Sequence, residues 1–507
     1  MKTTIIGFPR VGSLRELKFA SEKYFRKEIT AQELQDTAKT LRNTHWNLQK
    51  TSGITWIPTN DFSFYDNMLD TAVLLNAVPE RYRALALSEL DTYFAMARGY
   101  QGAEGDVKAL AMKKWFNTNY HYMVPEIDDT TKICLSGEKP FTEYQEAKAA
   151  GVNAKPVLIG AFTFLKLARF TGKKSASDYV ESTAQAYCNY LKKLSELGAE
   201  WAEFDEPYLV KDLSAEDIAL FTGLYQKILS QKGNVKVLLQ TYFGDVRDCY
   251  QEIVSLDLDG IGLDFVEGKQ TLQLVQQNGF PKDKVLFAGV VNGKNIWRNH
   301  YEKTTNLLQE LTKYSSQIVL NTSCSLLHVP YTLRHETKLN ENYKKHFSFA
   351  EEKLNELAEL ANIIDSASPK ETPAYQKNKA LFTEERFCEN KGVQEKVAAL
   401  TEKDFVRLPE FSEREKIQHK VLNLPLLPTT TIGSFPQTKE VRANRAAFRK
   451  GEITEEQYVA FNKKKIADCV ALQEEIGLDV LVHGEYERND MVEYFGECLD
   501  GYLFTEK

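Results

Sequence analysis

The sequence has few cysteines for its length, and their spacing excludes the common cysteine motifs. Its 507 residues include seven cysteines, at positions 134, 188, 249, 324, 388, 469 and 498. The number is odd and no pair has C-x-x-C spacing, so neither a disulfide framework nor a zinc ribbon is predicted. This cysteine usage is typical of a reducing compartment, and we expect a cytoplasmic protein.

Long apolar runs and an export signal are also missing. The run VLIGAF from Val157 is far shorter than the ~20 residues of a membrane helix. The opening MKTTIIGFPRVGS passes quickly into glycine, proline and arginine, without the apolar core of a signal peptide. We therefore expect a soluble protein with no membrane partner.

The net charge of -7 argues against a nucleic-acid partner, although a local basic pocket for an acidic ligand is compatible with it. We further expect a monomer.

Eight apolar segments rich in β-branched residues are present in the first two thirds of the chain. They are TTIIGF from Thr3, ITWIP from Ile54, PVLIGAF from Pro156, AEWAEF from Ala199, VKVLLQTY from Val235, DGIGLDF from Asp259, KVLFAGVV from Lys284 and QIVLNTS from Gln317. Such non-alternating runs are typical of strands buried on both faces of a parallel sheet. Segments of helical periodicity, such as 177–198, separate them. The alternation predicts an α/β fold, a (β/α)8 TIM barrel over residues 1–342, in preference to a doubly wound sheet.

Residues 343–424 are highly charged and have helical periodicity, which predicts a helical linker. Leu354, Leu357, Leu360 and Ile363 recur at helical spacing. This apolar stripe favours packing against a barrel over a loose tether.

The chain also contains an internal repeat. TTIIGFPRVGS from Thr3 resembles TTTIGSFPQT from Thr429, and an offset of 424 residues places Glu28 on Glu452 and Asp66 on Asp490. The same offset aligns Lys39 with Lys463, Leu48 and Gln49 with Leu472 and Gln473, and Gly53 with Gly477. So long a period indicates duplication of a whole barrel and not a solenoid.

The second copy, residues 425–507, supplies only two predicted strands, TTTIGSF and LDVLVHG. Two strands cannot close a barrel of eight and leave unpaired edges. We expect a chain truncated early in its second barrel. The alternative is a C-terminal appendage that docks on the first barrel.

Several long motifs occur in one order along the chain: GFPRVGSLRELK, KKWFNTNYHYMVPE, FDEP, TTTIGSFPQT and DVLVHGEYERNDMVEYFGE. Together they closely resemble the cobalamin-independent methionine synthase family. The resemblance implies a two-barrel methyltransferase of methionine biosynthesis that works without cobalamin. Its methyl donor would be 5-methyltetrahydropteroyltri-L-glutamate, its acceptor L-homocysteine and its product L-methionine.

The resemblance also implies zinc, which keeps the homocysteine sulfur as a thiolate. The family's His, Cys, Glu and Cys ligands lie on later strands of the second barrel, as does its proton-donating His. We therefore expect no metal ligand and no catalytic residue in this chain, which would be inactive alone. Cys324 and the nearby His328 are too few for a tetrahedral site. Asp205 and Glu206 are expected to hold loops together.

The resemblance assigns two groups of binding residues. Arg15, Glu16, Leu17, Lys18 and Lys114 match positions that bind the folate polyglutamate tail, for which cations are the natural complement. Ile432, Gly433 and Ser434 match contacts to the homocysteine carboxylate, and Glu485 matches the residue that takes the ammonium. Asp61 falls opposite Glu485 under the repeat offset. His483 is expected to be a packed histidine.

Two alternatives remain at this point. Besides the methyltransferase that the resemblance implies, the chain could be a non-catalytic barrel fragment that binds folate polyglutamate, or another barrel methyltransferase or decarboxylase of related lineage. The RELK motif and Lys114 argue against the second, because such enzymes bind no polyglutamate. Stronger folate binding with each added glutamate, weakened by salt, would separate the two.

Overall fold

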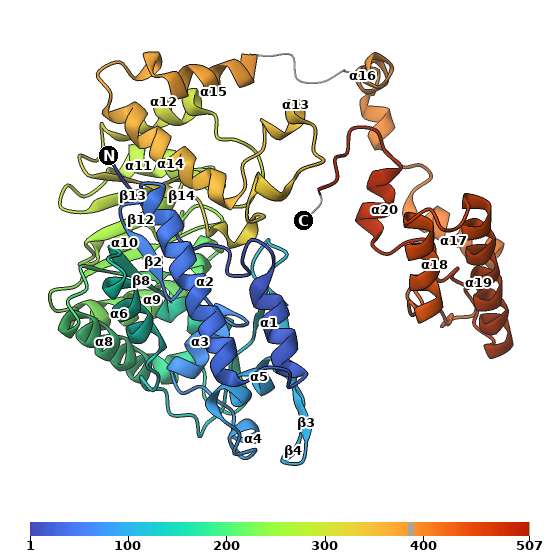
Figure 1. The fold of residues 1–507 in the computed structure, drawn as a ribbon, viewed down its shortest axis with the longest axis horizontal. Helices are drawn as coiled ribbons and strands as arrows, with labels where there is room; N and C mark the ends of the chain where they lie inside the picture. Colours follow the sequence, from blue (N-terminus) through green and yellow to red (C-terminus); the bar gives the residue numbers. More distant parts are fainter. Residues whose placement is uncertain (384–389, 506–507) are drawn as a thin grey trace. The chain divides into compact units, whose positions relative to one another are not determined.

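The computed structural model describes residues 1–383 and 390–505, which form two compact units (Figure 1). Unit 1 comprises the described residues before 384, and unit 2 those from 390 to 505. The six cysteines within these ranges are all free, and Cys388 lies outside them. Within the same ranges, no helix has the length and apolar character needed to cross a bilayer.

Unit 1 is organised around an eight-stranded parallel sheet. Its strands are β1 (Lys2–Thr3), β2 (Ile57–Thr59), β8 (Ala154–Ile159), β10 (Trp201–Asp205), β11 (Lys236–Gln240), β12 (Gly260–Asp264), β13 (Val285–Val291) and β14 (Ile318–Thr322). Their order is β1-β14-β13-β12-β11-β10-β8-β2, and every pair is parallel. Each strand falls within or overlaps one of the eight predicted segments. The predicted α/β fold with eight parallel strands is therefore confirmed.

The edge strands of this curled sheet are connected. A parallel bridge joins Thr4, just after β1, to Trp56, just before β2. The hydroxyl of Thr4 also donates to the carbonyl of Trp56 at 2.7 Å.

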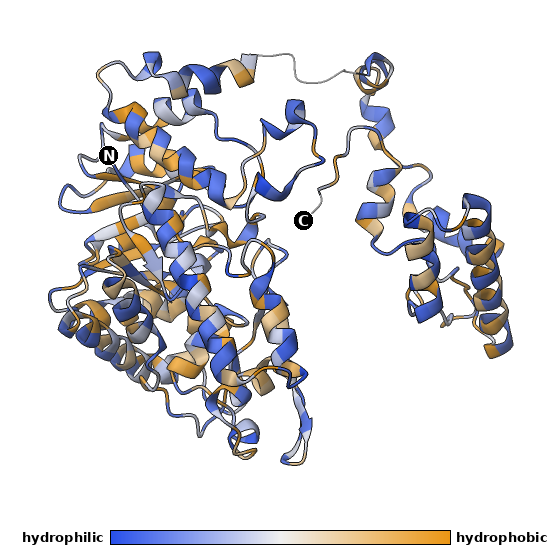
Figure 2. Ribbon diagram, viewed as in Figure 1, coloured by the Kyte–Doolittle hydropathy of each residue, from blue (hydrophilic) through white to orange (hydrophobic). Residues whose placement is uncertain are grey.

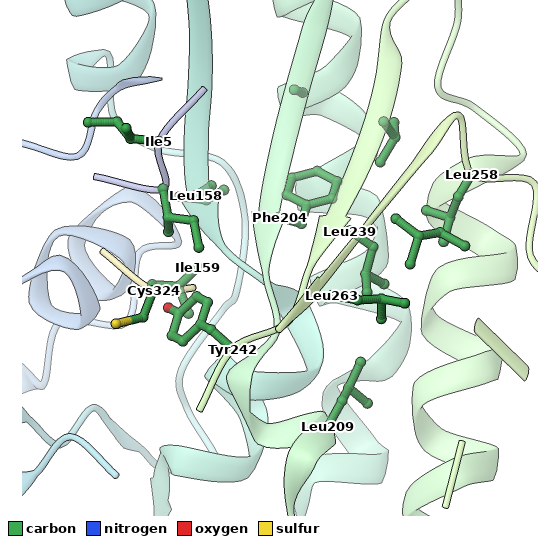
Figure 3. Packing of buried hydrophobic residues seen from close by; sticks show 14 of the residues in the cluster. Ile5, Leu158, Ile159, Phe204, Leu209, Leu239, Tyr242, Leu258, Leu263 and Cys324 are labelled. Carbon is green, nitrogen blue, oxygen red and sulfur yellow. The ribbon is translucent and has the colours of Figure 1, made fainter. Parts of the chain in front are cut away.

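The strands are largely apolar in sequence because both of their faces are covered. All residues of β8, β10, β12 and β14 are buried. Leu158, Phe204, Leu239 and Leu263, from four neighbouring strands, belong to one hydrophobic cluster (Figure 3). The strands stand out as hydrophobic in Figure 2, whereas the helices carry mixed colours.

Helices follow most strands. They are α2 (Ala31–Thr51), α6 (Lys139–Ala149), α7 (Ala161–Leu167), α8 (Val180–Glu196), α9 (Ala215–Leu229), α10 (Tyr250–Ser255), α11 (Thr271–Asn278) and α12 (Tyr301–Leu311). Short additional helices are α1 (Glu16–Phe25), α3 (Asn67–Leu74), α4 (Glu80–Arg83), α5 (Glu89–Arg98) and α13 (Glu341–Lys344). Three short strand pairs, not predicted, join β3 (Tyr100–Gly102) to β4 (Gly105–Val107), β5 (Met112–Lys114) to β6 (His121–Met123), and β7 (Glu126–Ile127) to β9 (Arg169–Phe170).

The predicted linker is divided between the two units. Its first part, α14 (Ala350–Asp365) and α15 (Pro373–Thr383), belongs to unit 1. Leu354, Leu357, Leu360 and Ile363 are each at most 1% exposed, and α14 contacts β1, β13 and β14. The apolar stripe therefore packs on the sheet, as predicted.

Unit 2 is helical. It contains α16 (Lys391–Ala398), α17 (Phe411–Leu422), α18 (Lys439–Arg449), α19 (Glu455–Ile476) and α20 (Met491–Glu497). The segments TTTIGSF and LDVLVHG were predicted as strands, but here they share only one parallel bridge, Ser434 with Gly484. Among residues 390–505 neither segment pairs with a further strand, and a parallel pair without further strands is a weak ladder.

The two copies of the sequence repeat also form matching backbone hydrogen bonds. In unit 1, the carbonyl of Thr3 accepts the N–H groups of Thr55 and Trp56, both at 3.1 Å. In unit 2, the carbonyl of Thr429 accepts those of Asp479 and Val480, again at 3.1 Å.

The helices of the repeat begin and end alike. Thr30 and Thr454, 424 residues apart, each form a capping box at the start of a long helix, α2 and α19. Gly53 and Gly477, near the ends of these helices, have φ of 85° and 84°. The two segments therefore share local structure as well as sequence.

Candidate functional site

The predicted folate-tail residues at the start of α1 differ in accessibility. Arg15 is exposed and precedes the helix in a left-handed conformation, with φ of 65°. Lys18 is about half exposed and lies 3.9 Å from Glu22. These two cations are therefore available to an acidic ligand.

Glu16 and Leu17 have structural contacts instead. The Glu16 carboxylate accepts the backbone N–H of Leu14 at 3.0 Å and lies so close to Gly12 that a Cβ there would collide with it. Leu17 is 4% exposed and packs in a small cluster with Leu41 and Phe62. Both residues shape the turn that presents Arg15 and Lys18.

Lys114 comes from a different element. It ends β5, where it pairs with His121 of β6, and its side chain is exposed. The neighbouring Trp115 is buried and packs against Tyr122 at a ring distance of 5.6 Å. The strand pair therefore fixes the backbone of Lys114 while its ammonium group faces solvent.

The predicted homocysteine residues of unit 2 are brought together, except for Ile432. Ser434 bridges to Gly484, and a Cβ on Gly433 would lie 2.5 Å from Oε1 of Glu485. A side chain at position 433 would require this carboxylate to shift. Ile432 is 85% exposed and points away from a packed environment.

Glu485 is held by a partner that sequence reasoning missed. Its Oε1 accepts a charged hydrogen bond from Arg488 at 2.9 Å, and its backbone is left-handed, with φ of 59°. Its own N–H donates to Nδ1 of His483. The spacing of three residues in GEYER was the available signal for the Glu485–Arg488 pair.

Asp61, the counterpart of Glu485 in unit 1, has a more enclosed setting. One carboxylate oxygen accepts the backbone N–H of Phe8 at 2.9 Å. Burial raises the pKa of Asp61 to about 7, against the lowering effect of this hydrogen bond. The two copies therefore place an acid at the same position with different electrostatics.

The carboxyl ends of the unit 1 strands enclose little free space. A cavity of about 30 Å³, lined among others by Asp61, Asp205, Tyr242 and His328, has room for only one or two water molecules. The hydroxyl of Tyr242 donates to Asp205 at 3.2 Å.

Glu206 is a structural residue, as predicted. Its carboxylate accepts N–H groups of Phe162 and Thr163 at 2.9 and 2.7 Å, and the hydroxyl of Tyr225 at 2.6 Å. Burial raises its pKa to about 7 despite these donors. Glu206, just after β10, thereby ties α7 to α9.

The described residues do not fit a zinc ion. Cys324 is fully buried, and desolvation raises the pKa of its thiol, whereas a zinc ligand must be a thiolate. Burial and the charge of Lys294 lower the pKa of His328 to about 4. Over residues 1–383 and 390–505, no three His, Cys, Asp or Glu side chains are grouped suitably for a metal.

Comparison with known proteins identifies the family. The family described as "Cobalamin-independent synthase, N-terminal domain" matches residues 2–316, and its "Catalytic domain" matches residues 427–507. The chain belongs to the cobalamin-independent methionine synthase family. The expected resemblance is therefore confirmed.

Close relatives match over the whole chain. It is 56% identical over 508 residues to a protein of Campylobacter jejuni subsp. doylei and 57% identical over 506 residues to one of Streptococcus thermophilus. Both are named 5-methyltetrahydropteroyltriglutamate--homocysteine methyltransferase. Each match covers 100% of this chain and 67% of the relative.

A solved structure supports the fold. A Listeria monocytogenes protein assigned to vitamin-B12 independent methionine synthases superposes with a TM-score of 0.50 at 15% identity, covering 72% of this chain and 99% of its own.

Proposed function

We propose that this chain takes part in methyl transfer from 5-methyltetrahydropteroyltriglutamate to homocysteine, which forms methionine. The observation that carries the proposal is the identity of 56 and 57%, along the full chain, to two methyltransferases named for this reaction. Both domains of the cobalamin-independent synthase family also match in order.

Unit 1 would bind the glutamate tail of the folate. Several γ-linked carboxylates need several cations, and Arg15, Lys18 and Lys114 are all exposed. Arg15 offers a planar fork and the lysines offer point charges. Glu16 and Leu17 would act by holding the turn.

Unit 2 would bind part of homocysteine. Glu485 would accept the ammonium group, and the backbone around Gly433 and Ser434 would hold the carboxylate. The Glu485–Arg488 pair supports this arrangement, because the arginine holds the Glu485 carboxylate beside Gly433, where the amino acid would lie.

Zinc would hold the homocysteine sulfur as a thiolate in this family's chemistry. Since the described residues do not fit zinc, we propose that residues 1–507 alone do not turn over. We also propose that unit 1 closes as a complete (β/α)8 barrel, supported by the Thr4–Trp56 bridge, and that the second copy is the start of a duplicated barrel.

Segment exchange tests the proposed reaction. Residues 1–507 would replace the matching segment of the longer Streptococcus thermophilus relative, and methionine formation from homocysteine and the triglutamate donor would be measured. We expect the chimera to form methionine and to contain about one zinc per chain. We expect the 507 residues alone to form none and to purify without zinc.

The unmodified relative is the positive control, and circular dichroism shows whether the chimera is folded. A folded chimera that binds zinc yet forms no methionine would contradict the proposed function. Zinc or turnover in the 507 residues alone would contradict the proposal that they lack a metal site.

A further inference from the structure

A second cleft lies on the helical exterior of unit 1. It is a cavity of about 620 Å³ lined by residues of α2, α3, α5 and α6, which is within the size range of small-molecule sites. The residues proposed above for folate and homocysteine are not among its lining. Its ligand would therefore be separate from both substrates.

The lining combines apolar walls with an excess of negative charge. Phe64, Leu74, Leu90 and Tyr93 provide apolar and aromatic surface. Six lining residues are acidic and three are basic, which leaves a net charge of -3. This lining is complementary to a molecule with an apolar body and a positive charge.

One buried carboxylate oxygen of the cleft lining accepts no hydrogen bond within the described parts of the chain. The side chain of Glu143, on α6, is 5% exposed. Its Oε1 lies 3.3 Å from the ammonium of Lys139 and 3.8 Å from the guanidinium of Arg42. Its Oε2 is buried without a hydrogen-bond partner among the described residues. An unsatisfied buried acceptor of this kind is costly, so a donor entering the cleft would be favoured.

The neighbouring cations have other partners. Arg42 donates to Glu146 at 2.7 Å. Lys139 donates to Oδ1 of Asn60 at 2.8 Å and to the carbonyl of Phe62 at 2.7 Å, and it pairs with Asp70 at 3.2 Å. In the structure neither cation donates a hydrogen bond to Oε2.

The repeat provides an internal comparison. In unit 2 a cavity of about 550 Å³ is lined by Val459, Lys463, Ile466, Arg488, Tyr494 and Glu497. The offset of 424 places these on residues 35, 39, 42, 64, 70 and 73, all of which line the unit 1 cleft. The second cavity has four acidic and four basic lining residues. A cleft at this position therefore occurs in both copies of the repeat, whereas only the unit 1 cleft has a lining with net negative charge.

We propose that the cleft between α2, α3, α5 and α6 binds a small organic cation, with its ammonium group at Oε2 of Glu143 and its apolar body against Phe64 and Leu90. The inference does not depend on the proposed methyl transfer.

Calorimetric titration of the 507-residue chain with phenethylammonium tests it. We expect one site per chain, because the cavity of unit 2 lacks net negative charge. The neutral analogue 2-phenylethanol should bind at least about tenfold more weakly. Glu143→Gln should also weaken phenethylammonium binding about tenfold.

A matched pair of lysine variants tests the location without disturbing the buried cluster. Gln35 and Thr40 are both exposed on α2, but only Gln35 lines the cleft. Gln35→Lys should weaken binding about fivefold through repulsion, and Thr40→Lys less than about twofold. Equal binding of amine and alcohol, equal effects of the two lysines, or no binding up to about 10 mM would overturn the proposal.

Discussion

Asp66 provides a sharp test of how the polar interior of unit 1 is stabilised. It is 1% exposed and precedes α3 as its N-cap. Its Oδ1 accepts the N–H of Met68 at 2.9 Å, and its Oδ2 accepts those of Leu69 and Met123, both at 3.0 Å. One side chain therefore caps a helix and also ties it to β6.

Asp66→Asn changes one of these oxygens into a donor with almost no change in volume. If the remaining oxygen keeps the two N–H groups of Leu69 and Met123, the new amide faces the N–H of Met68. One hydrogen bond is lost and one buried donor is left unsatisfied, which together cost about 2 to 3 kcal/mol. We expect unit 1 to lose that much free energy of unfolding.

Urea unfolding followed by tryptophan fluorescence measures the free energy of unfolding of unit 1. All five tryptophans, Trp46, Trp56, Trp115, Trp201 and Trp297, lie in unit 1. Asp36→Asn, at an exposed position of α2, is the control and should change the free energy by less than about 0.5 kcal/mol. Equal effects of the two substitutions would refute the buried hydrogen-bond network.

Three further predictions concern the pH dependence of the Asp66 contribution, the lysines proposed to bind folate, and a helix cap. Burial raises the pKa of Asp66 to about 7, so its protonation stabilises unit 1 below the unfolded value of about 3.9, and this is lost as pH rises through 7. The free-energy difference between wild type and Asp66→Asn should therefore grow as pH falls from about 8 to 5, by up to about 1.4 kcal/mol per pH unit; a constant difference would show that Asp66 stays ionised. Lys18→Glu or Lys114→Glu should weaken triglutamate folate binding about tenfold in equilibrium dialysis while leaving the melting temperature nearly unchanged, and unchanged affinity would remove that residue from the site. Thr30→Ala should lower the stability of unit 1 by about 1 kcal/mol in the fluorescence assay; the same change at Thr454 should leave that signal unaffected, and a shift there would show that the units unfold together.

The sequence predicted the framework of unit 1 well because burial dictates its pattern. Strands covered on both faces are mostly apolar along their length, and the runs at Pro156 and Lys284 could be recognised for that reason. The stripe of α14 was visible because a helix packed on one side repeats every three to four residues.

The short strand pairs could not be recognised in this way. β3, β4 and β5 are mostly exposed, and MKK at β5 carries no apolar alternation. The two strands expected in the second copy have the apolar composition of strands, but composition cannot supply the neighbouring strands that complete a ladder.

The candidate site was predictable by position and less so by environment. The motifs placed Gly433 and Glu485 in one site, and the structure brings them within contact. Whether a residue is free to bind depends on tertiary neighbours, and so the burial of Leu17 emerged only from the fold. The pairing of Glu485 with Arg488 had a signal in the sequence, their spacing of three residues, but the spacing alone did not show that the two side chains meet.

The dependence of folate affinity on tail length tests the central claim most directly. The dissociation constants of the mono- and triglutamate forms of 5-methyltetrahydrofolate would be measured for this chain at about 0.02 and 0.2 M salt. The account predicts that the triglutamate binds at least about tenfold more tightly at low salt and loses most of that advantage at high salt. Equal affinity for the two forms at both salt concentrations would contradict it.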